Sequence, residues 1–236
     1  MKPEKVDDPV VREIFDWVTQ MEGSVPNHFY VEMNFPEFFK AKLGATKVLW
    51  QMGELRLDEI QHIGIAVSKA NGCSYCTAAF CTILNHGLKA DEGEVKQFVV
   101  EGAKAVSDGR LRTLVEFALK VNNNAAGVTG EEIAQLRKAG LTDKGIVQLC
   151  HLVSDFASYN RLNLALQTDY DYRDMWRQLA FPNRTVPLSR SSFGWFLHHA
   201  YPCSRSHGSP RLWWAGEGTR PYVARWRRIF CSAYPE

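Results

Sequence analysis

The chain has 236 residues, of which 45% are hydrophobic and 23% are charged, and its formal net charge is +2. This composition is that of an ordinary globular protein with one good-sized domain, or one domain and an appendage. So small a net charge argues for neither a nucleic-acid nor a membrane partner, and we expect neither. No apolar run is long enough to span a bilayer, and the first residues lack the apolar core of a signal peptide, so a cytoplasmic location is expected.

The first part of the chain predicts three helices separated by short breaks. Residues 8–21 place apolar side chains at helical spacing behind Asp8, a residue type that caps helix N-termini. Residues 36–52 form a second such segment, which opens with a proline and ends at Gly53. A third helix begins at Leu57 and runs to the pair Asn71-Gly72, which ends a helix in the way a C-cap does.

The third helix leads into the stretch NGCSYC at positions 71–76, which holds two cysteines two residues apart. Apolar residues after it recur with a period near 3.6 and predict a further helix to about Asn85. Cys73 is then expected at the N-cap and Cys76 in the first turn. Free backbone N–H groups and the helix dipole favour a thiolate at such positions.

A CxxC pair can bind zinc, act as a redox centre or simply be buried. A structural zinc site needs four ligands, but the sequence has no second CxxC and no HxxxH, and its other cysteines and seven histidines are scattered. Burial as small hydrophobes suits Cys81 and Cys150, but suits Cys73 and Cys76 poorly because these flank a polar serine at a turn. We therefore predict that Cys73 and Cys76 form a catalytic dithiol that needs no cofactor.

The rest of the body predicts four more helices, at residues 91–100, 108–122, 131–139 and 143–167. No run shows the alternation of a strand, so the predicted fold class of residues 1–180 is all-α. Asn160 and Arg161 put polar groups on the core face of the last helix, either for a contact with a neighbouring helix or subunit or as part of a pocket. The apolar residues expected on this face are Ile146, Leu149, Cys150, Val153, Phe156, Ala157 and Leu164.

The composition changes abruptly at about residue 181. Residues 181–236 hold six of the ten prolines and four of the seven tryptophans, with eight Arg, no Lys and two acidic residues. Basic residues between aromatic ones can form a nucleic-acid or membrane-surface patch, and a shift of reading frame would produce the same change. We expect an irregular, poorly ordered extension that carries no chemistry.

The stretch LDEIQHIGIAVSKANGCSYC at positions 57–76 resembles the signature of the alkylhydroperoxidase-D-like family, in the carboxymuconolactone decarboxylase superfamily. The similarity covers about residues 20–170, including VPN at 25–27 and YNR at 159–161. It implies an all-helical bundle, a homo-oligomer (trimer or hexamer) and a thiol-dependent peroxidase that reduces small hydroperoxides. It also implies that Cys76 attacks the peroxide, that Cys73 resolves it as a disulfide, and that an external dithiol of the thioredoxin or lipoyl type restores the thiols.

Two positions depart from the family pattern. The pattern has a histidine four residues after the second cysteine and a relay glutamate twelve residues before the first, and this sequence has Phe80 and Gln61 there. General-base assistance is worth about 100- to 10,000-fold in rate, so these replacements matter. The helix dipole alone could supply the thiolate, His62, Glu59 or His151 could approach from another direction, or the dithiol could serve another task.

Three functions follow from these observations. The first is a thiol oxidoreductase that reduces peroxide or a disulfide through a Cys73–Cys76 couple. The second is a redox-sensing or binding protein whose dithiol changes oligomer packing without fast turnover, as the lost relay positions suggest. The third is a lyase or isomerase acting on a small lactone or carboxylate, against which the retained CxxC argues.

Overall fold

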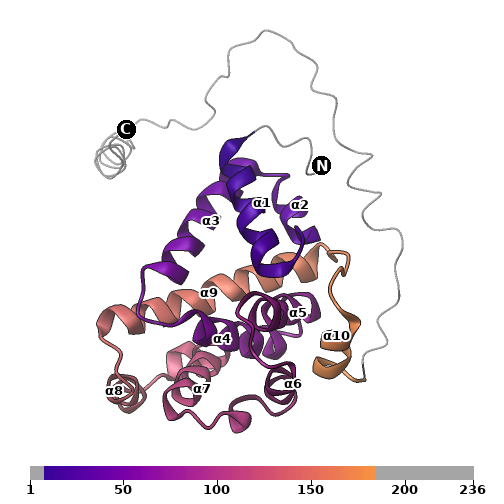
Figure 1. The fold of residues 1–236 in the computed structure, drawn as a ribbon. Helices are drawn as coiled ribbons and strands as arrows, with labels where there is room; N and C mark the ends of the chain where they lie inside the picture. Colours follow the sequence, from indigo (N-terminus) through magenta and orange to yellow (C-terminus); the bar gives the residue numbers. More distant parts are fainter. Residues whose placement is uncertain (1–7, 184–236) are drawn as a thin grey trace, which may run out of the picture. The chain divides into compact units, whose positions relative to one another are not determined.

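The computed structural model describes residues 8–183, and every regular element in this part is a helix (Figure 1). The predicted all-α fold class is therefore confirmed. None of the described helices is long and apolar enough to cross a membrane. The α-helices are α1 (Pro9–Glu22), α2 (Asn27–Glu32), α3 (Pro36–Gln51), α4 (Leu57–Ala70), α5 (Ser74–Thr82), α6 (Glu92–Glu101), α7 (Gly109–Asn124), α8 (Gly130–Lys138), α9 (Asp143–Ala165) and α10 (Asp174–Ala180). A π-helical turn, η2 (Ile83–Gly87), continues α5, and two 3₁₀ turns are η3 (Gly102–Ala105) and η4 (Ala125–Gly127).

The buried side chains form two hydrophobic clusters. The smaller one joins α1, α2 and α3, where the rings of Phe15, Phe29 and Phe39 pack edge to face. The larger one is made of buried hydrophobic residues of α4 to α10, together with Trp50 of α3 and Leu55. At their junction the Trp17 ring packs against Trp50, with 5.8 Å between ring centroids.

The link between α4 and α5 positions the two cysteines. Gly72 adopts a left-handed φ of 73° directly after the C-cap of α4. The Gly72 N–H bonds to the Lys69 carbonyl (3.0 Å) and the Cys73 N–H to the Ser68 carbonyl (2.9 Å), which is the Schellman pattern. Because this motif reverses the chain within three residues, Cys73 becomes the N-cap of α5, as predicted.

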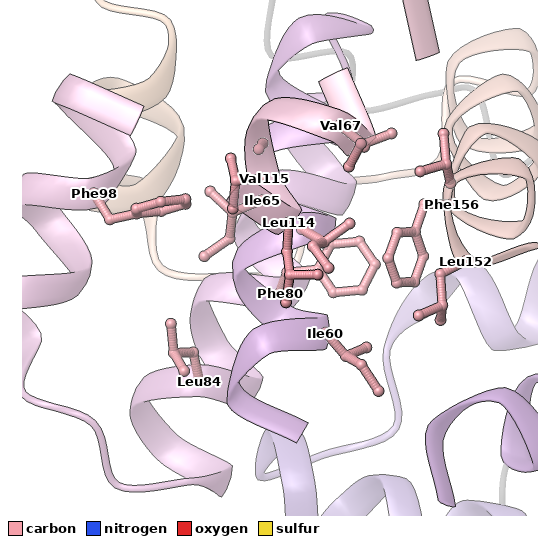
Figure 2. Close-up of a cluster of buried hydrophobic side chains, with 14 of the residues drawn as sticks. Ile60, Ile65, Val67, Phe80, Leu84, Phe98, Leu114, Val115, Leu152 and Phe156 are labelled. Carbon is pink, nitrogen blue, oxygen red and sulfur yellow. The ribbon is translucent and has the colours of Figure 1, made fainter. Parts of the chain in front are cut away.

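In the larger cluster α5 packs closely against α4 and α9. Figure 2 shows the rings of Phe80 from α5 and Phe156 from α9 beside each other, and their centroids are 4.7 Å apart. The Phe80 ring also lies against Gly64 of α4, where an added Cβ would be only 2.6 Å from it. Glycine at position 64 therefore allows α4 to approach an aromatic side chain on α5.

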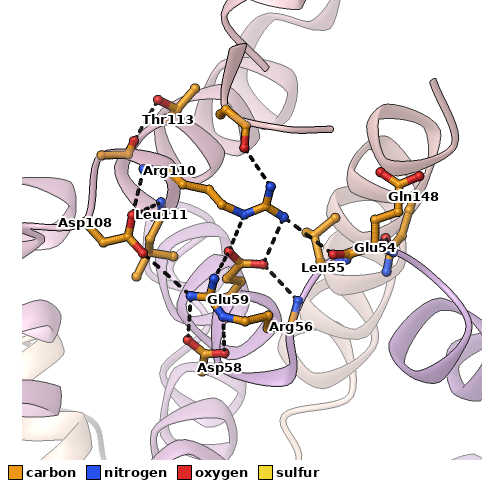
Figure 3. A network of polar contacts seen from close by, with 12 residues as sticks. Glu54, Leu55, Arg56, Asp58, Glu59, Asp108, Arg110, Leu111, Thr113 and Gln148 are labelled. Carbon is orange, nitrogen blue, oxygen red and sulfur yellow. Dashed lines mark hydrogen bonds and ion pairs between the residues drawn. The ribbon is translucent and has the colours of Figure 1, made fainter. Parts of the chain in front are cut away.

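An ion-pair network around one buried carboxylate joins the start of α4 to α7 (Figure 3). The Glu59 carboxylate is fully buried and is paired with Arg110 at 2.7 Å and Arg56 at 2.9 Å. Arg110 also donates to the Ala139 carbonyl at 2.7 Å. Because a buried carboxylate is stable only when its charge is paired and hydrogen-bonded, this network has a structural role.

The sequence predicted eight of the α-helices and missed α2 and α10, which have six and seven residues. On α9 the predicted core position Leu164 is 44% exposed, because the neighbouring Asn163 occupies the buried face at this turn. Leu152, which is not among the predicted core residues of this helix, is fully buried. The prediction of an irregular Arg/Trp/Pro-rich extension concerns residues 181–236, of which positions 184–236 lie outside the described part of the chain.

Candidate active site

The structure brings the two predicted cysteines together as a pair of thiols. Their Sγ atoms are 2.7 Å apart, and the Cys73 sulfur accepts the Cys76 backbone N–H at 3.3 Å. Both residues sit at the start of one helix and are held by the Schellman turn before it. A disulfide between them would therefore need only small side-chain movements.

Cys76 lines a cavity of about 70 Å³ between the two hydrophobic clusters, and is 4% exposed, whereas Cys73 is fully buried. One wall comes from α1, α2 and α3 and the other from α5, η2 and α9. The wall is predominantly aromatic and aliphatic, with a few polar groups. Its aromatic residues are Trp17, Phe29, Trp50, Tyr75, Phe80, Phe156 and Tyr159, and its other polar residues are Glu22, His28, Thr46 and Asn163.

Burial raises the pKa of the Cys76 thiol well above its usual range, and the neighbouring Cys73 adds to this shift. Amide groups of Asn160 and Asn163 oppose it by hydrogen bonding to the sulfur, and the Asn163 Nδ2 donates at 3.4 Å. The expectation that the helix start makes Cys76 a thiolate is therefore wrong. Desolvation disfavours the thiolate, so the Cys76 proton has to be removed during the reaction.

The two relay positions of the family pattern hold no proton carrier. Phe80 is part of the cavity wall, and its ring packs edge to face against Phe156. Gln61 is fully buried in α4, and neither its Oε1 nor its Nε2 has a hydrogen-bond partner in the described part of the chain. Gln61 is also absent from the cavity wall.

The three substitutes considered from the sequence lie elsewhere. His62 Nδ1 is 2.7 Å from the Asp58 carbonyl, and its ring packs against Phe98. Glu59 is held in the ion-pair network of Figure 3, and His151 is exposed on α9. None of the three lines the cavity beside Cys76.

Other ionisable groups, missed in the sequence, do line this cavity. Glu22, at the end of α1, accepts a hydrogen bond from Tyr172 Oη at 2.5 Å, and burial raises its pKa to about 8. His28, in α2, has a buried Nδ1 without a hydrogen-bond partner among the described residues, and burial with the nearby Lys42 charge lowers its pKa to about 3. Both residues lie more than 40 positions from the motif, so no local pattern could point to them.

Asn160 does more than the sequence indicated. Its side chain is buried, donates to Ser68 Oγ at 2.9 Å and accepts from Asn71 at 2.9 Å. The predicted contact with a neighbouring helix is thus present, and the amide also reaches Cys76. Arg161 is exposed.

The described residues contain no group of three or more His, Cys, Asp or Glu side chains placed to hold a metal ion. The other two cysteines among them, Cys81 and Cys150, are free. Cys81 is buried in the larger hydrophobic cluster, and Cys150 packs half-buried against it.

Comparison with known proteins gives structural relatives but no close sequence relative. No family model matches the chain, and no curated protein matches it. A solved structure described as an alkylhydroperoxidase AhpD core, an uncharacterised peroxidase-related protein from Ralstonia eutropha JMP134, has a TM-score of 0.64 and 26% identity, covering 76% of this chain and 93% of its own. A peroxidase-related protein from Silicibacter sp. TM1040 has a TM-score of 0.62 and 23% identity, covering 75% and 95%.

The debrominase Bmp8, solved in complex with 2,3,4-tribromopyrrole, has the same fold, with a TM-score of 0.61, 19% identity and coverage of 74% of this chain and 91% of its own. The neighbours thus include peroxidase-related proteins and an enzyme of different specificity. They agree with the resemblance carried by residues 57–76. The chain thus has the fold of the alkylhydroperoxidase AhpD core, and its residues 57–76 resemble the signature of alkylhydroperoxidase-D-like proteins.

Proposed function

We propose that the chain is a thiol oxidoreductase that reduces organic hydroperoxides through Cys73 and Cys76. The observation that carries this proposal is the geometry of the pair, two thiol sulfurs 2.7 Å apart with Cys76 facing an aromatic cavity. Cys76 attacks the terminal peroxide oxygen, becomes a sulfenic acid and releases an alcohol. Cys73 then displaces water to form a disulfide, which an external dithiol reduces.

The cavity wall indicates the kind of peroxide. Most of the wall is aromatic or aliphatic, and such a surface favours an uncharged apolar group over a hydrated one. We therefore propose an organic hydroperoxide as substrate in preference to hydrogen peroxide. The proposed reductant, a small or protein-bound dithiol, and the proposed homo-oligomer follow from the family resemblance alone.

Cysteine variants test this function. Cys76→Ser should abolish peroxide consumption, because serine is a poor nucleophile towards peroxide. Cys73→Ser should consume one equivalent of cumene hydroperoxide and then stop, because its sulfenic acid has no resolving thiol, and mass spectrometry after dimedone trapping should find that adduct on Cys76.

Cys150→Ser is the matched control, since this half-buried thiol is absent from the cavity wall and its loss should leave turnover unchanged. Peroxide turnover by Cys76→Ser at the wild-type rate would refute the proposed function. A wild-type protein that loses two thiols once, changes its oligomer size and does not turn over would instead support the redox-sensing alternative.

A second candidate function is reductive dehalogenation of a small aromatic compound. The aromatic cavity beside a nucleophilic cysteine favours it, and the debrominase neighbour shows that this fold can carry such an activity. Two thiols and a halogenated ring would give a disulfide, the dehalogenated ring, a halide ion and a proton. Bromide release from 2,3,4-tribromopyrrole by wild type, and its absence with Cys76→Ser, would support this function.

A further inference from the structure

The reaction of Cys76 with a peroxide needs a proton acceptor that the relay positions do not provide. The pKa of Cys76 is raised by burial, so the residue is a thiol before it reacts. The thiol proton has to leave, and the departing alkoxide has to gain a proton. A single group on the cavity wall that exchanges a proton at near-neutral pH could do both.

Two side chains on that wall are the candidates, Glu22 and His28. The pKa of His28 is lowered to about 3, so its imidazole is a weak base for a thiol proton. The pKa of Glu22 is raised to about 8, which makes its carboxylate a much stronger base and its carboxylic acid available at neutral pH. The tyrosines of the wall, Tyr75 and Tyr159, have pKa values raised further by burial and stay protonated.

The position of Glu22 suits this role. Glu22 lines the same cavity as Cys76, and its carboxyl is held by the hydrogen bond from Tyr172 Oη at 2.5 Å. A cavity of about 70 Å³ has room for a water molecule that could carry a proton between Glu22 and the sulfur. Glu22 and Cys76 thus line one cavity although they come from different helices, α1 and α5.

We propose that Glu22 is the proton-transfer group of the Cys76 site and replaces the relay that Gln61 and Phe80 have removed. This role rests on the peroxidase function proposed above. The Glu22 carboxylate accepts the Cys76 proton, and the sulfur attacks the terminal oxygen of the hydroperoxide. The O–O bond breaks, its electron pair goes to the alkoxide, and the proton on Glu22 passes to that alkoxide. The products are a Cys76 sulfenic acid and an alcohol, and Glu22 returns to its starting state.

Two neighbouring groups shift the pKa of Glu22 in opposite directions, so substitutions at these positions should change it. The Tyr172 hydrogen bond stabilises the carboxylate and lowers the pKa of Glu22, whereas the nearby Asp171 charge raises it. Removing the first should shift the pKa upward, and removing the second should shift it downward. The titratable groups that face or adjoin Glu22 are Asp171 and Tyr172 before α10, Tyr75 and Cys76 on α5, His28 on α2, and His86 on η2, whose ring lies beside Gly23.

The experiment measures single-turnover oxidation of the reduced full-length protein by cumene hydroperoxide from pH 6 to 10. In wild type the rate constant should rise with pH and level off near pH 8, as Glu22 ionises. Glu22→Gln, which keeps the shape of the side chain, should lose this inflection and react about 100-fold more slowly at pH 8. Tyr172→Phe should move the inflection to higher pH and Asp171→Asn to lower pH, shifts that a purely structural role would not produce.

Glu13→Gln is the matched control, since Glu13 is exposed on the same helix and pairs only weakly with Lys47 at 3.5 Å. It should leave the whole profile unchanged. A wild-type protein that reacts through Cys76 while Glu22→Gln keeps the same inflection would overturn this inference and leave the peroxidase function standing. Turnover that survives Cys76→Ser would instead reject the function itself.

Discussion

At the scale of single residues, the environment of Cys76 combines opposing influences on its proton. Burial and the adjacent Cys73 favour the thiol, while the amides of Asn160 and Asn163 favour the thiolate. Hydrogen bonds to a charged group are each worth about 1.5–3 kcal/mol, so the two amides are a substantial part of this balance. Both come from α9, whose buried face ends in these polar residues.

Asn163→Leu tests the contribution of one amide. Leucine has a similar size but cannot donate to the sulfur, so the pKa of Cys76 should rise further. The rate constant for alkylation of Cys76 by iodoacetamide at pH 8.5 should fall by roughly tenfold or more. Asn34→Leu, at an exposed site, is the control and should alkylate like wild type. Equal rates for Asn163→Leu and wild type would show that the 3.4 Å contact does not stabilise the thiolate.

The sequence located the cysteines but not their chemical environment. A CxxC after an Asn-Gly turn is a local pattern, and it correctly predicted Cys73 at an N-cap and Cys76 in the first turn. The thiol pKa depends on how deeply the tertiary structure buries the sulfur, which local spacing does not report. Glu22 and His28 join the site only through the packing of α1 and α2 against α5 and α9.

At the scale of elements, the approach of α4 to α5 depends on Gly64. A glycine inside a helix costs about 1 kcal/mol relative to alanine, so the Phe80 ring against it is the evident reason for its presence. The ring also fills the wall position at which the family pattern has a histidine. Phe80 therefore has two effects: its ring packs against Gly64 of α4, and it replaces the histidine of the family pattern.

Gly64→Ala should therefore destabilise the protein despite the higher helix propensity of alanine. The added Cβ would lie 2.6 Å from the Phe80 ring. Overpacking of this kind costs about 1–3 kcal/mol, and the expected result is a net loss in the free energy of urea unfolding. Gly44→Ala, in α3, has no atom within 4 Å of the added Cβ and should gain about 0.5–1 kcal/mol. A gain for both variants would mean that α5 moves away at little cost.

The long helices could be predicted because their apolar pattern repeats over several turns. The 14-residue α4 and the 23-residue α9 show apolar periodicity over several turns. The six-residue α2 and seven-residue α10 span about two turns, too few for a period to stand out. Yet α10 contributes the fully buried Trp176 to the core, and α2 contributes His28 to the cavity wall.

At the scale of the whole described unit, the two hydrophobic clusters differ greatly in size. The smaller cluster, from α1, α2 and α3, has six buried hydrophobic residues, while the larger one includes residues from every helix from α4 to α10 and Trp50 of α3. The free energy of local unfolding is lower for a region with fewer buried apolar contacts. The candidate cavity lies at the boundary between the two clusters, so the less extensive one forms one of its walls.

Native-state hydrogen exchange should show this difference. Amide protons of α1 and α2 should exchange through openings of lower free energy than those of α4, α7 and the middle of α9, with a gap of at least about 1–2 kcal/mol. Mass spectrometry of peptic fragments across a series of low urea concentrations would measure it. Identical opening free energies in all five helices would instead show that both clusters unfold as one cooperative unit.

The burial of the sulfur pair also bears on the order of events during turnover. Cys73 is fully buried and Cys76 faces the cavity, so peroxide and reducing dithiol would have to reach the pair through the same space, one after the other. Under the proposed function this gives ping-pong steady-state kinetics, with each substrate acting as a competitive inhibitor of the other at high concentration. Flux would then depend on the ratio of peroxide to reductant as well as on their amounts.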